Sequence, residues 1–222
     1  LPIYMFQTGS GLAADANLVI AHAQLEIARR MQGIYIATNN TPVVDKGTHL
    51  PANGYRWLGN LTGRAAAKTL IDGEGWQCTQ LIGGEYRGKT LLLRFHTPVA
   101  PLQVATPYNG RTASPIVNQS DLGIMVQDDS GPLGINSVQL DGQVALATVG
   151  RAIVGMPYVT LGPRANGATV CLADSDQGKL IGIYDYSAGS GQYADEDIPA
   201  LTGKSYPTPN FCLADRQALV AA

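Results

Sequence analysis

The sequence predicts an α/β part, the closing portion of a doubly wound sheet, followed by an all-β, sandwich-like domain. Strand and helix patterns alternate over the first third of the chain, and no sustained helical period follows. The 222 residues include 26 Gly and 13 Pro, while charged residues make up 14% and form no blocks. This composition is typical of short strands joined by many turns.

The first part alternates strand and helix. An apolar run at residues 3–7 predicts a strand, and the glycine-containing residues 8–11 end it. From Asp15 to Gly33 a helix is predicted, because apolar residues recur there at helical spacing. They are Leu18, Ala21, Leu25 and Ala28. A short apolar strand at residues 34–37 and an amphipathic helix at residues 53–70 follow.

This order of elements is typical of a doubly wound sheet. Ligands of such sheets bind beyond the carboxyl ends of the strands. The loops that follow the two strands, at residues 8–11 and 38–51, are therefore expected to face one site.

A domain boundary is predicted at residues 72–75, where the helical periodicity ends, so that residues 1–72 form the α/β part and residues 76–222 the β part. Many short strands at regular spacing indicate a sandwich. They are predicted at residues 78–82, 90–96, 102–105, 122–127, 136–140, 144–148, 158–161, 169–172 and 180–184. Asp141-Gly142 predicts a type I′ hairpin, and residues 186–209 a long surface loop of the kind that often binds ligands.

Composition excludes several classes of function. The net charge is −2 with no basic cluster, so no nucleic-acid partner is expected. No apolar run reaches the roughly 18 residues that a membrane-spanning helix needs, so we expect a soluble protein with no membrane partner. The chain opens on Leu1 rather than an initiator methionine, which indicates a processed product or a fragment of something longer.

The potential metal ligands show no metal-binding spacing. Cys78, Cys171 and Cys212 are far apart and form no CxxC pair, so they predict neither a zinc site nor a disulfide framework, and we interpret them as small buried residues. The acidic runs at residues 174–176 and 195–197 lack the spacing of a calcium loop, and we interpret them as solvated turns. No metal and no cofactor are expected.

Asp45 and His49 are the candidate catalytic residues. They lie on a glycine-containing loop between a predicted strand and a predicted helix. A histidine oriented by a carboxylate can take a proton from a hydroxyl nucleophile, as in a Ser-His-Asp triad. The alternative is that Asp45 only forms a turn and His49 only caps the helix.

Several short stretches carry a resemblance to a known family. They are Ile3-Tyr4-Met5-Phe6-Gln7-Thr8, Gln24-Leu25-Glu26, Gly47-Thr48-His49-Leu50, Asn53-Gly54-Tyr55 and Leu58-Gly59. The last three resemble the last conserved block of the SGNH (GDSL-like) hydrolases, especially the carbohydrate-esterase branch similar to sialate O-acetylesterases, and the first two fit that branch too. The resemblance implies the closing portion of a flavodoxin-like SGNH sheet, with His49 as the base and Asp45 orienting it. The family spacing is Asp-x-x-His, whereas this chain has Asp-x-x-x-His.

The second part resembles the β-rich accessory domain that follows the esterase domain in bacterial and phage-associated members. The similar stretches are residues 91–102, 126–131, 172–176 and 206–211. The family's nucleophile block, oxyanion glycine block and Gly-x-Asn-Asp block all lie N-terminal to what this chain contains. The resemblance therefore implies that the nucleophilic serine lies outside this chain.

Three further features have weaker functional readings. Ser10 lacks the flanking glycines of a nucleophile elbow, and we interpret it as a substrate-binding residue of a Gly-Ser-Gly loop. Around the long loop, four tyrosines could stack on sugar rings or only cover the core, namely Tyr184, Tyr186, Tyr193 and Tyr206. Residues 83–90 satisfy the P-loop formula, but residues 90–95 predict a strand where a P-loop needs a helix, so a turn is predicted.

Two functional hypotheses follow from the resemblance. In the first, the chain is the C-terminal part of a carbohydrate esterase that removes O-acetyl groups from a polysaccharide, completed by the upstream half of the hydrolase domain. In the second, it is a non-catalytic glycan-binding or structural module of a phage tail protein. Both imply a glycan partner and a location on a virion tail or outside the cell. The sequence leaves a homo-oligomer open.

Overall fold

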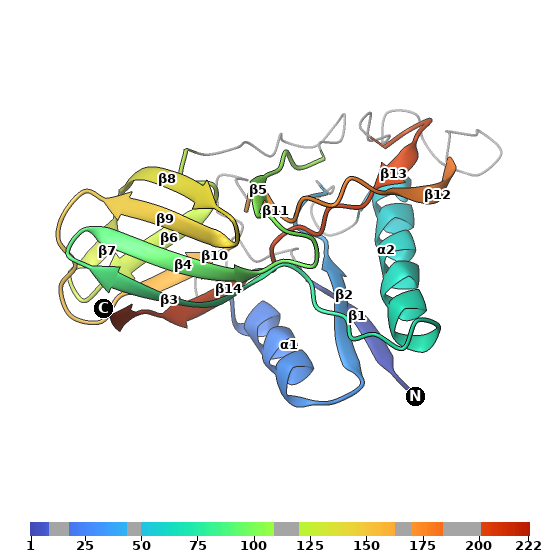
Figure 1. The fold of residues 1–222 in the computed structure, drawn as a ribbon, viewed down its shortest axis with the longest axis horizontal. Helices are drawn as coiled ribbons and strands as arrows, with labels where there is room; N and C mark the ends of the chain where they lie inside the picture. The colour runs from blue at the N-terminus through green and yellow to red at the C-terminus, as the bar shows by residue number, and fades with distance from the viewer. Residues whose placement is uncertain (9–17, 44–49, 109–119, 163–169, 184–200) are drawn as a thin grey trace.

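The structure is a computed structural model, and it describes residues 1–8, 18–43, 50–108, 120–162, 170–183 and 201–222. These residues contain two helices and several sheets, so the expected β-rich fold is confirmed (Figure 1). Neither described helix is long and apolar enough to cross a bilayer. In chain order the elements are β1 (Ile3–Gln7), α1 (Val19–Arg30), β2 (Ile34–Asn39), α2 (Ala52–Leu70), β3 (Gln80–Arg87), β4 (Thr90–His96), β5 (Gln103–Val104), β6 (Ile124–Asp128), β7 (Gly131–Leu133), β8 (Ile135–Asp141), β9 (Val144–Val149), β10 (Tyr158–Leu161), β11 (Leu172–Ala173), β12 (Lys179–Ile183), β13 (Ser205–Pro207), β14 (Asp215–Ala218) and β15 (Val220–Ala221).

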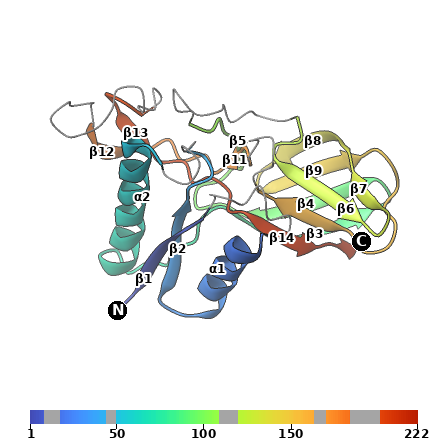
Figure 2. The same ribbon diagram turned by 180° about the vertical axis from the view of Figure 1, so that it is seen from behind.

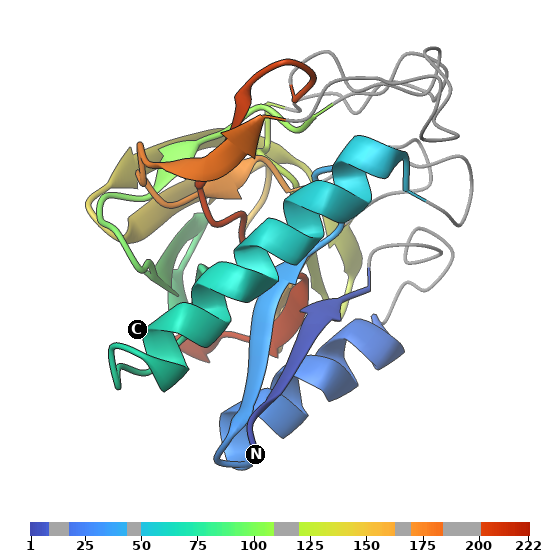
Figure 3. The same cartoon turned by 90° about the vertical axis from the view of Figure 1, so that its right-hand side faces the viewer.

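Strands β1 and β2 pair in parallel, with Gln7 opposite Asn39 at their carboxyl ends. Helices α1 and α2 lie on either side of this pair, and each helix contacts both strands (Figure 3). The buried cluster that joins the three layers includes Leu25, Ile36, Ala37 and Ala65. Because the strands are parallel, the loops that follow them leave from the same edge.

Two larger sheets form the β part. One has the order β15-β3-β4-β9-β8, and the other has the order β14-β10-β6-β7. Both contribute to one buried hydrophobic cluster, so their inner faces pack on each other. Along β4, Leu91, Leu93 and Phe95 are buried while the residues between them are not, as in a strand with one face on the core. Strand β11 pairs with β5, and β12 pairs with β13.

A hairpin at this position is confirmed, but its two-residue turn is Gly142-Gln143 rather than Asp141-Gly142, because Asp141 is the last residue of β8 and pairs with Val144. Its turn type differs from the prediction. A type I′ turn needs positive φ at both central residues, and here Gly142 has φ 56° while Gln143 is not among the described residues with positive φ. Glycine followed by a residue of ordinary φ is the arrangement typical of a type II′ turn.

The segment with the P-loop formula is a β-hairpin. Arg87 of β3 pairs with Thr90 of β4, and Gly88 supplies a positive φ of 61° in the turn between them. Strand β4 begins at Thr90 where a P-loop needs a helix, so the backbone N–H groups that would cradle a phosphate are engaged in a sheet. The prediction of a turn and a strand is therefore confirmed.

The sequence missed four short strands, β7, β13, β14 and β15. Strand β13 at Ser205–Pro207 lies within the stretch predicted as a continuous loop, so that prediction is wrong at these residues. Strand β14 has the polar sequence Asp-Arg-Gln-Ala and pairs with β10. These strands are too short or too polar to give a periodic signal, and pairing with neighbours distant in sequence creates them.

The C-terminal segment packs against the parallel strands before it enters the β part (Figure 2). Leu213 shares a buried cluster with Ile36 of β2 and with Trp76 and Cys78, which precede β3. Its backbone N–H donates to the Thr79 carbonyl at 2.9 Å. Residues from both sides of position 72 therefore contribute to the same core.

Candidate functional site

All five site residues predicted from the sequence lie outside the described residues. They are Ser10, Asp45, His49, Tyr186 and Tyr193. The acidic run at residues 195–197 lies outside them as well. What the structure describes is the framework on both sides of residues 44–49 and at the carboxyl ends of β1 and β2.

The residues that flank this segment, Val43 and Leu50, are held close to the first turn of α2. Both are buried, at 4% and 8% exposure, and they belong to one hydrophobic cluster. An ideal Cβ on Gly54 would lie 2.8 Å from Cγ1 of Val43 and 3.1 Å from Cβ of Leu50. Only glycine at position 54 leaves room for this packing, because real Cβ atoms do not approach other atoms so closely.

Tyr108 fixes the chain just before residue 44. Its backbone N–H donates to the Pro42 carbonyl at 2.7 Å, and it forms a parallel bridge with Val43. Its ring lies edge-on to those of Trp57 and Phe211, each at a centroid distance of 5.6 Å. Burial raises the pKa of the Tyr108 phenol, so the group is neutral and acts in packing.

Asn39 at the end of β2 joins this edge to the C-terminal segment. Its side-chain nitrogen donates to the carbonyls of Phe211 at 3.2 Å and Cys212 at 3.0 Å. Its side-chain oxygen accepts from the backbone N–H of Thr41 at 3.1 Å and from the Thr41 hydroxyl at 2.7 Å. Four bonds satisfy a buried amide, so Asn39 holds two segments together rather than facing a ligand.

Gln7 plays the same part at the end of β1. Its side-chain nitrogen donates to the carbonyls of Ala21 at 3.0 Å and Ala214 at 2.8 Å. Its side-chain oxygen accepts from the backbone N–H of Ala214 at 2.7 Å. The carboxyl ends of both strands are thus fixed by a buried amide to residues 211–214, which rigidifies the edge from which the candidate loops leave.

Asn53 lies in the first turn of α2, within the stretch Asn53-Gly54-Tyr55, and is fully buried. Its side-chain nitrogen donates to the hydroxyl of Tyr206 at 3.0 Å. Tyr206 is itself fully buried. Of the two roles predicted for the tyrosines around the long loop, Tyr206 therefore has the second, which is to cover the core. Asn53 therefore ties the start of α2 to β13.

Two polar atoms at this edge are buried without a hydrogen-bond partner among the described residues. They are Oδ1 of Asn40, which follows β2, and Nε1 of Trp57, which lies in the cluster with Val43 and Leu50. Both flank the position where residues 44–49 leave and rejoin the described chain.

A second histidine–carboxylate pair lies elsewhere. His22 of α1 has Nδ1 3.0 Å from Oδ1 of Asp215, whose side chain is fully buried. Arg29 donates to the other carboxylate oxygen at 3.0 Å. Among the described residues, no hydroxyl is hydrogen-bonded to the His22 side chain.

The acidic run at residues 174–176 is not the solvated turn that the sequence predicts. Asp174 is fully buried and accepts from the backbone and side-chain nitrogens of Asn210 at 2.8 and 2.7 Å, and burial raises its pKa. Asp176 pairs with Arg64 of α2. The two aspartates hold segments together, and no group of three potential ligands for a metal occurs in the described parts of the chain.

The three cysteines are free and buried, as the sequence predicts. Burial raises the pKa of the Cys78 thiol to about 12. The thiol is therefore protonated at neutral pH and is not a nucleophile.

Sequence reasoning missed the framework residues Gln7, Asn39, Asn53 and His22. For the first two a signal exists, because each is a polar residue that ends an apolar strand of a parallel pair. No pattern in the sequence pairs His22 with Asp215, since 193 positions separate them.

Comparison with known proteins gives a match in fold. No family model matches the chain, and no curated protein matches it. Among solved structures, a carbohydrate acetylesterase from Xanthomonas citri superposes with a TM-score of 0.57 at 14% identity, covering 98% of this chain and 41% of the other. The N-terminal part of a bacterial S-layer protein superposes with a TM-score of only 0.30 at 11% identity, covering 71% of this chain and 27% of the other.

These findings concern the fold. The chain spans about two fifths of the length of the acetylesterase it matches, and nearly all of this chain takes part in the superposition. At 14% identity the likeness carries no residue roles. The protein has a fold similar to that of part of a carbohydrate acetylesterase.

Proposed function

We propose that this chain is the C-terminal part of an SGNH-type carbohydrate esterase that removes O-acetyl groups from a polysaccharide. The observation that carries the proposal is the likeness in fold to a carbohydrate acetylesterase over 98% of the chain, together with a histidine-bearing segment that follows a parallel strand. Residues 1–72 would belong to the hydrolase domain, and residues 76–222 would form its accessory β-sandwich.

The exposed edge of β1 supports an upstream half of the hydrolase domain as partner. Among the described residues β1 pairs only with β2. Its side chains Ile3 and Phe6 are 56% and 42% exposed, which is unusual for a strand flanked by two helices. A two-stranded sheet is marginal alone, and further parallel strands beside β1 would bury these residues.

In this proposal the serine of the upstream half attacks the acetyl carbonyl carbon while His49 takes the hydroxyl proton. Asp45 accepts a hydrogen bond from the other ring nitrogen and stabilises the imidazolium. His49 then returns the proton to the sugar oxygen as it leaves. Water attacks the acetyl-enzyme by the same route, releasing acetate and restoring the serine.

The test is His49→Ala in the protein joined to its natural upstream sequence, assayed with p-nitrophenyl acetate and with an O-acetylated polysaccharide. We expect turnover to fall by about 10³-fold or more, because the proton acceptor is lost. The matched control is His22→Ala, which removes the other histidine–carboxylate pair. Undiminished turnover in His49→Ala, or a loss that follows His22 instead, overturns the assignment.

The alternative, a glycan-binding or structural module of a phage tail protein, gives a different result in the same protein. It predicts glycan binding with no release of acetate from any O-acetylated substrate. Under either hypothesis the proposed location is a virion tail or the outside of a cell, where the protein would encounter such polysaccharides.

A further inference from the structure

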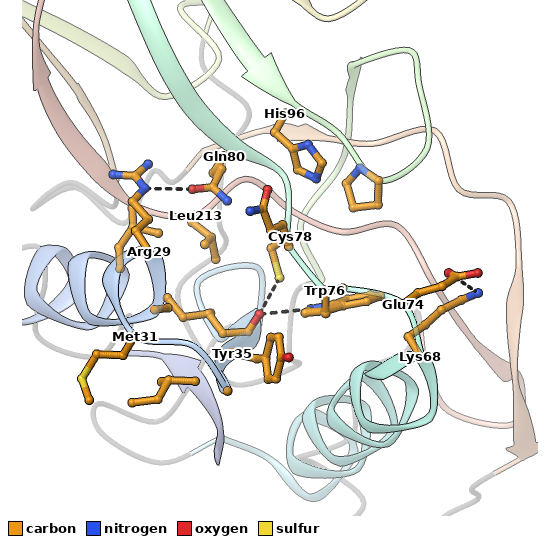
Figure 4. A pocket seen from close by; sticks show the side chains of 18 of the residues that line it. Arg29, Met31, Tyr35, Lys68, Glu74, Trp76, Cys78, Gln80, His96 and Leu213 are labelled. Atoms are coloured by element: carbon orange, nitrogen blue, oxygen red, sulfur yellow. Dashed lines mark hydrogen bonds and ion pairs between the residues drawn. The ribbon is translucent and has the colours of Figure 1, made fainter. Parts of the chain in front are cut away.

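A cleft of about 980 Å³ lies at the amino-terminal end of β2 (Figure 4). Its walls come from the C-terminal turn of α1, the start of β2, the C-terminal half of α2 and the segment that leads into β3. Ile34 to Ile36 line the cleft, and the carboxyl end of β2 at Asn39 lies roughly 10 Å beyond Ile36. The cleft is thus a separate site.

Polar donors point into the cleft from β3 and β4. Gln80 and His96 are directly opposite each other in the antiparallel pair, so their side chains stand on the same face. Gln80 is only 6% exposed, and its side-chain oxygen accepts from Nε of Arg29 at 3.1 Å. That bond fixes the amide with its nitrogen directed toward the side of His96 (Figure 4).

Two aromatic rings form the opposite wall. The indole nitrogen of Trp76 donates to the carbonyls of Ile36 at 3.1 Å and Ala37 at 3.2 Å, which fixes the ring. Tyr35 stacks on Tyr4, with centroids 5.5 Å apart. Rigid aromatic rings beside planar hydrogen-bonding groups suit sugars, whose C–H faces lie on rings while their hydroxyls meet amides and imidazoles.

The cations that line the cleft are all neutralised by acidic side chains. The pairs are Arg29 with Asp215, Arg30 with Glu26, Arg64 with Asp176, and Lys68 with Glu74. An anionic ligand would have to break an existing pair to gain a counter-charge, so the lining favours a neutral one.

Among the described residues that line the cleft, none is arranged for catalysis. The Cys78 thiol donates to the carbonyls of Ile36 and Ala37, each at 3.1 Å, and is protonated at neutral pH. Among the described residues His96 has no carboxylate to orient it, and no group of metal ligands lines the cleft. The arrangement is that of a binding site.

We propose that this cleft binds one or two neutral sugar residues of a polysaccharide, with Gln80 and His96 bonding hydroxyls and Tyr35 contacting a ring face beside the nearly buried Trp76. This inference goes beyond the proposed ester cleavage, and it rests on the proposed function for the choice of a polysaccharide as ligand. A second site on the same polysaccharide would raise the residence time of a chain without taking part in ester cleavage.

The experiment is an NMR titration of the indole N–H signals in this chain. The chain has two tryptophans, and Trp57 is fully buried in the cluster with Tyr108, so its signal is an internal reference. The probes are β-1,4-linked hexaoses of xylose, mannose and glucose, with hexagalacturonate as the anionic comparison. We expect at least one neutral hexaose to shift the Trp76 signal and leave that of Trp57 unchanged.

The variants are Gln80→Ala and His96→Ala, each expected to weaken binding by about 10-fold or more, because a buried hydrogen bond to the sugar is lost. The matched control is Gln139→Ala, an exposed glutamine on β8 that should bind as the wild type does. His96 is only partly buried, so His96→Ala keeps the test valid if Gln80→Ala fails to fold.

Three results would overturn the proposal. One is no shift of the Trp76 signal with any neutral hexaose at about 10 mM, a concentration that reveals even weak binding. Another is binding that persists unchanged in folded His96→Ala. The third is a preference for hexagalacturonate. Since ester hydrolysis is not measured, these outcomes are distinct from a failure of the proposed esterase function.

Discussion

Gly54 shows at the scale of one residue how Val43 and Leu50, which flank residues 44–49, are packed on α2. It lies in the first turn of α2, a position where alanine would ordinarily be the better helix former. The side chains of Val43 and Leu50 occupy the space that a Cβ would need. The glycine is therefore required by tertiary packing and not by its own backbone conformation, since its φ is not among the positive values.

Replacing Gly54 by alanine is expected to destabilise the protein by about 1–3 kcal/mol, because the new methyl group overpacks the cluster. The matched controls are Gly59→Ala and Gly63→Ala on the same helix, where a Cβ meets nothing within 4 Å. These should stabilise by about 0.5–1 kcal/mol through helix propensity. Urea unfolding measures all three, and a stabilising Gly54→Ala would contradict the packing argument.

At the scale of an element, Asp128 closes the turn between β6 and β7. Its side chain is fully buried and accepts from the backbone N–H groups of Ser130 at 2.9 Å and Val154 at 2.8 Å. Arg151 donates to both carboxylate oxygens, at 2.6 and 2.8 Å. This bidentate pair holds the pKa of the carboxyl well below its usual range.

Because the pKa of Asp128 is lowered, the stability of the β part depends on pH. The charged form of Asp128 is the one that the fold stabilises, so its contribution is complete above the unfolded-state pKa of about 4 and is lost as the pH falls toward the folded-state value. We expect Asp128→Asn to be less stable than the wild type at neutral pH, and the difference to shrink below about pH 4.

Urea unfolding of both proteins from neutral pH to about pH 2.5 checks this expectation. The control is Asp141→Asn, an exposed aspartate at the end of β8, for which the difference from the wild type should stay constant. A difference between Asp128→Asn and the wild type that does not change with pH would show that the carboxylate charge is not what matters.

For the whole molecule, Arg64 of α2 links the helical part to segments near the C-terminus. It pairs with Asp176, donates to the Thr208 carbonyl at 3.1 Å, and lies over the Trp76 ring at 5.5 Å. Its side chain is 23% exposed and that of Asp176 is 12% exposed, so both charges are mostly withdrawn from water. Breaking such a pair leaves one charge uncompensated.

Arg64→Met is expected to lower the free energy of unfolding by about 2–4 kcal/mol, since the methionine keeps apolar contact with Trp76 but leaves Asp176 unpaired. Arg87→Met, at an exposed position on β3, should change it by no more than about 0.5 kcal/mol. Calorimetry also tests the predicted division into residues 1–72 and 76–222. Two separate transitions in the wild type would support it, whereas one transition shifted as a whole in Arg64→Met would favour a shared core.

The sequence alone determined the β-rich class, the order of the first two strands and helices, and most strands of the β part. The sequence predicts Thr90–His96 and Tyr158–Leu161 with their observed bounds, because both are rich in residues of strong strand preference. Buried residues alternate with less buried ones in the first strand, and the second strand is almost entirely buried. It also determined which histidine resembles a catalytic base. These are local properties, set by side-chain type and periodicity.

Only the tertiary structure decided the rest. The strand β14 with its polar sequence and the burial of Asp174 depend on neighbours distant in the chain. The hydrogen bonds of the Gln7 and Asn39 side-chain amides to residues 211–214 also depend on such neighbours, as does the cleft between α1, α2 and β3. Pairing and burial across such separations arise from the packing of the whole chain, which no local pattern records.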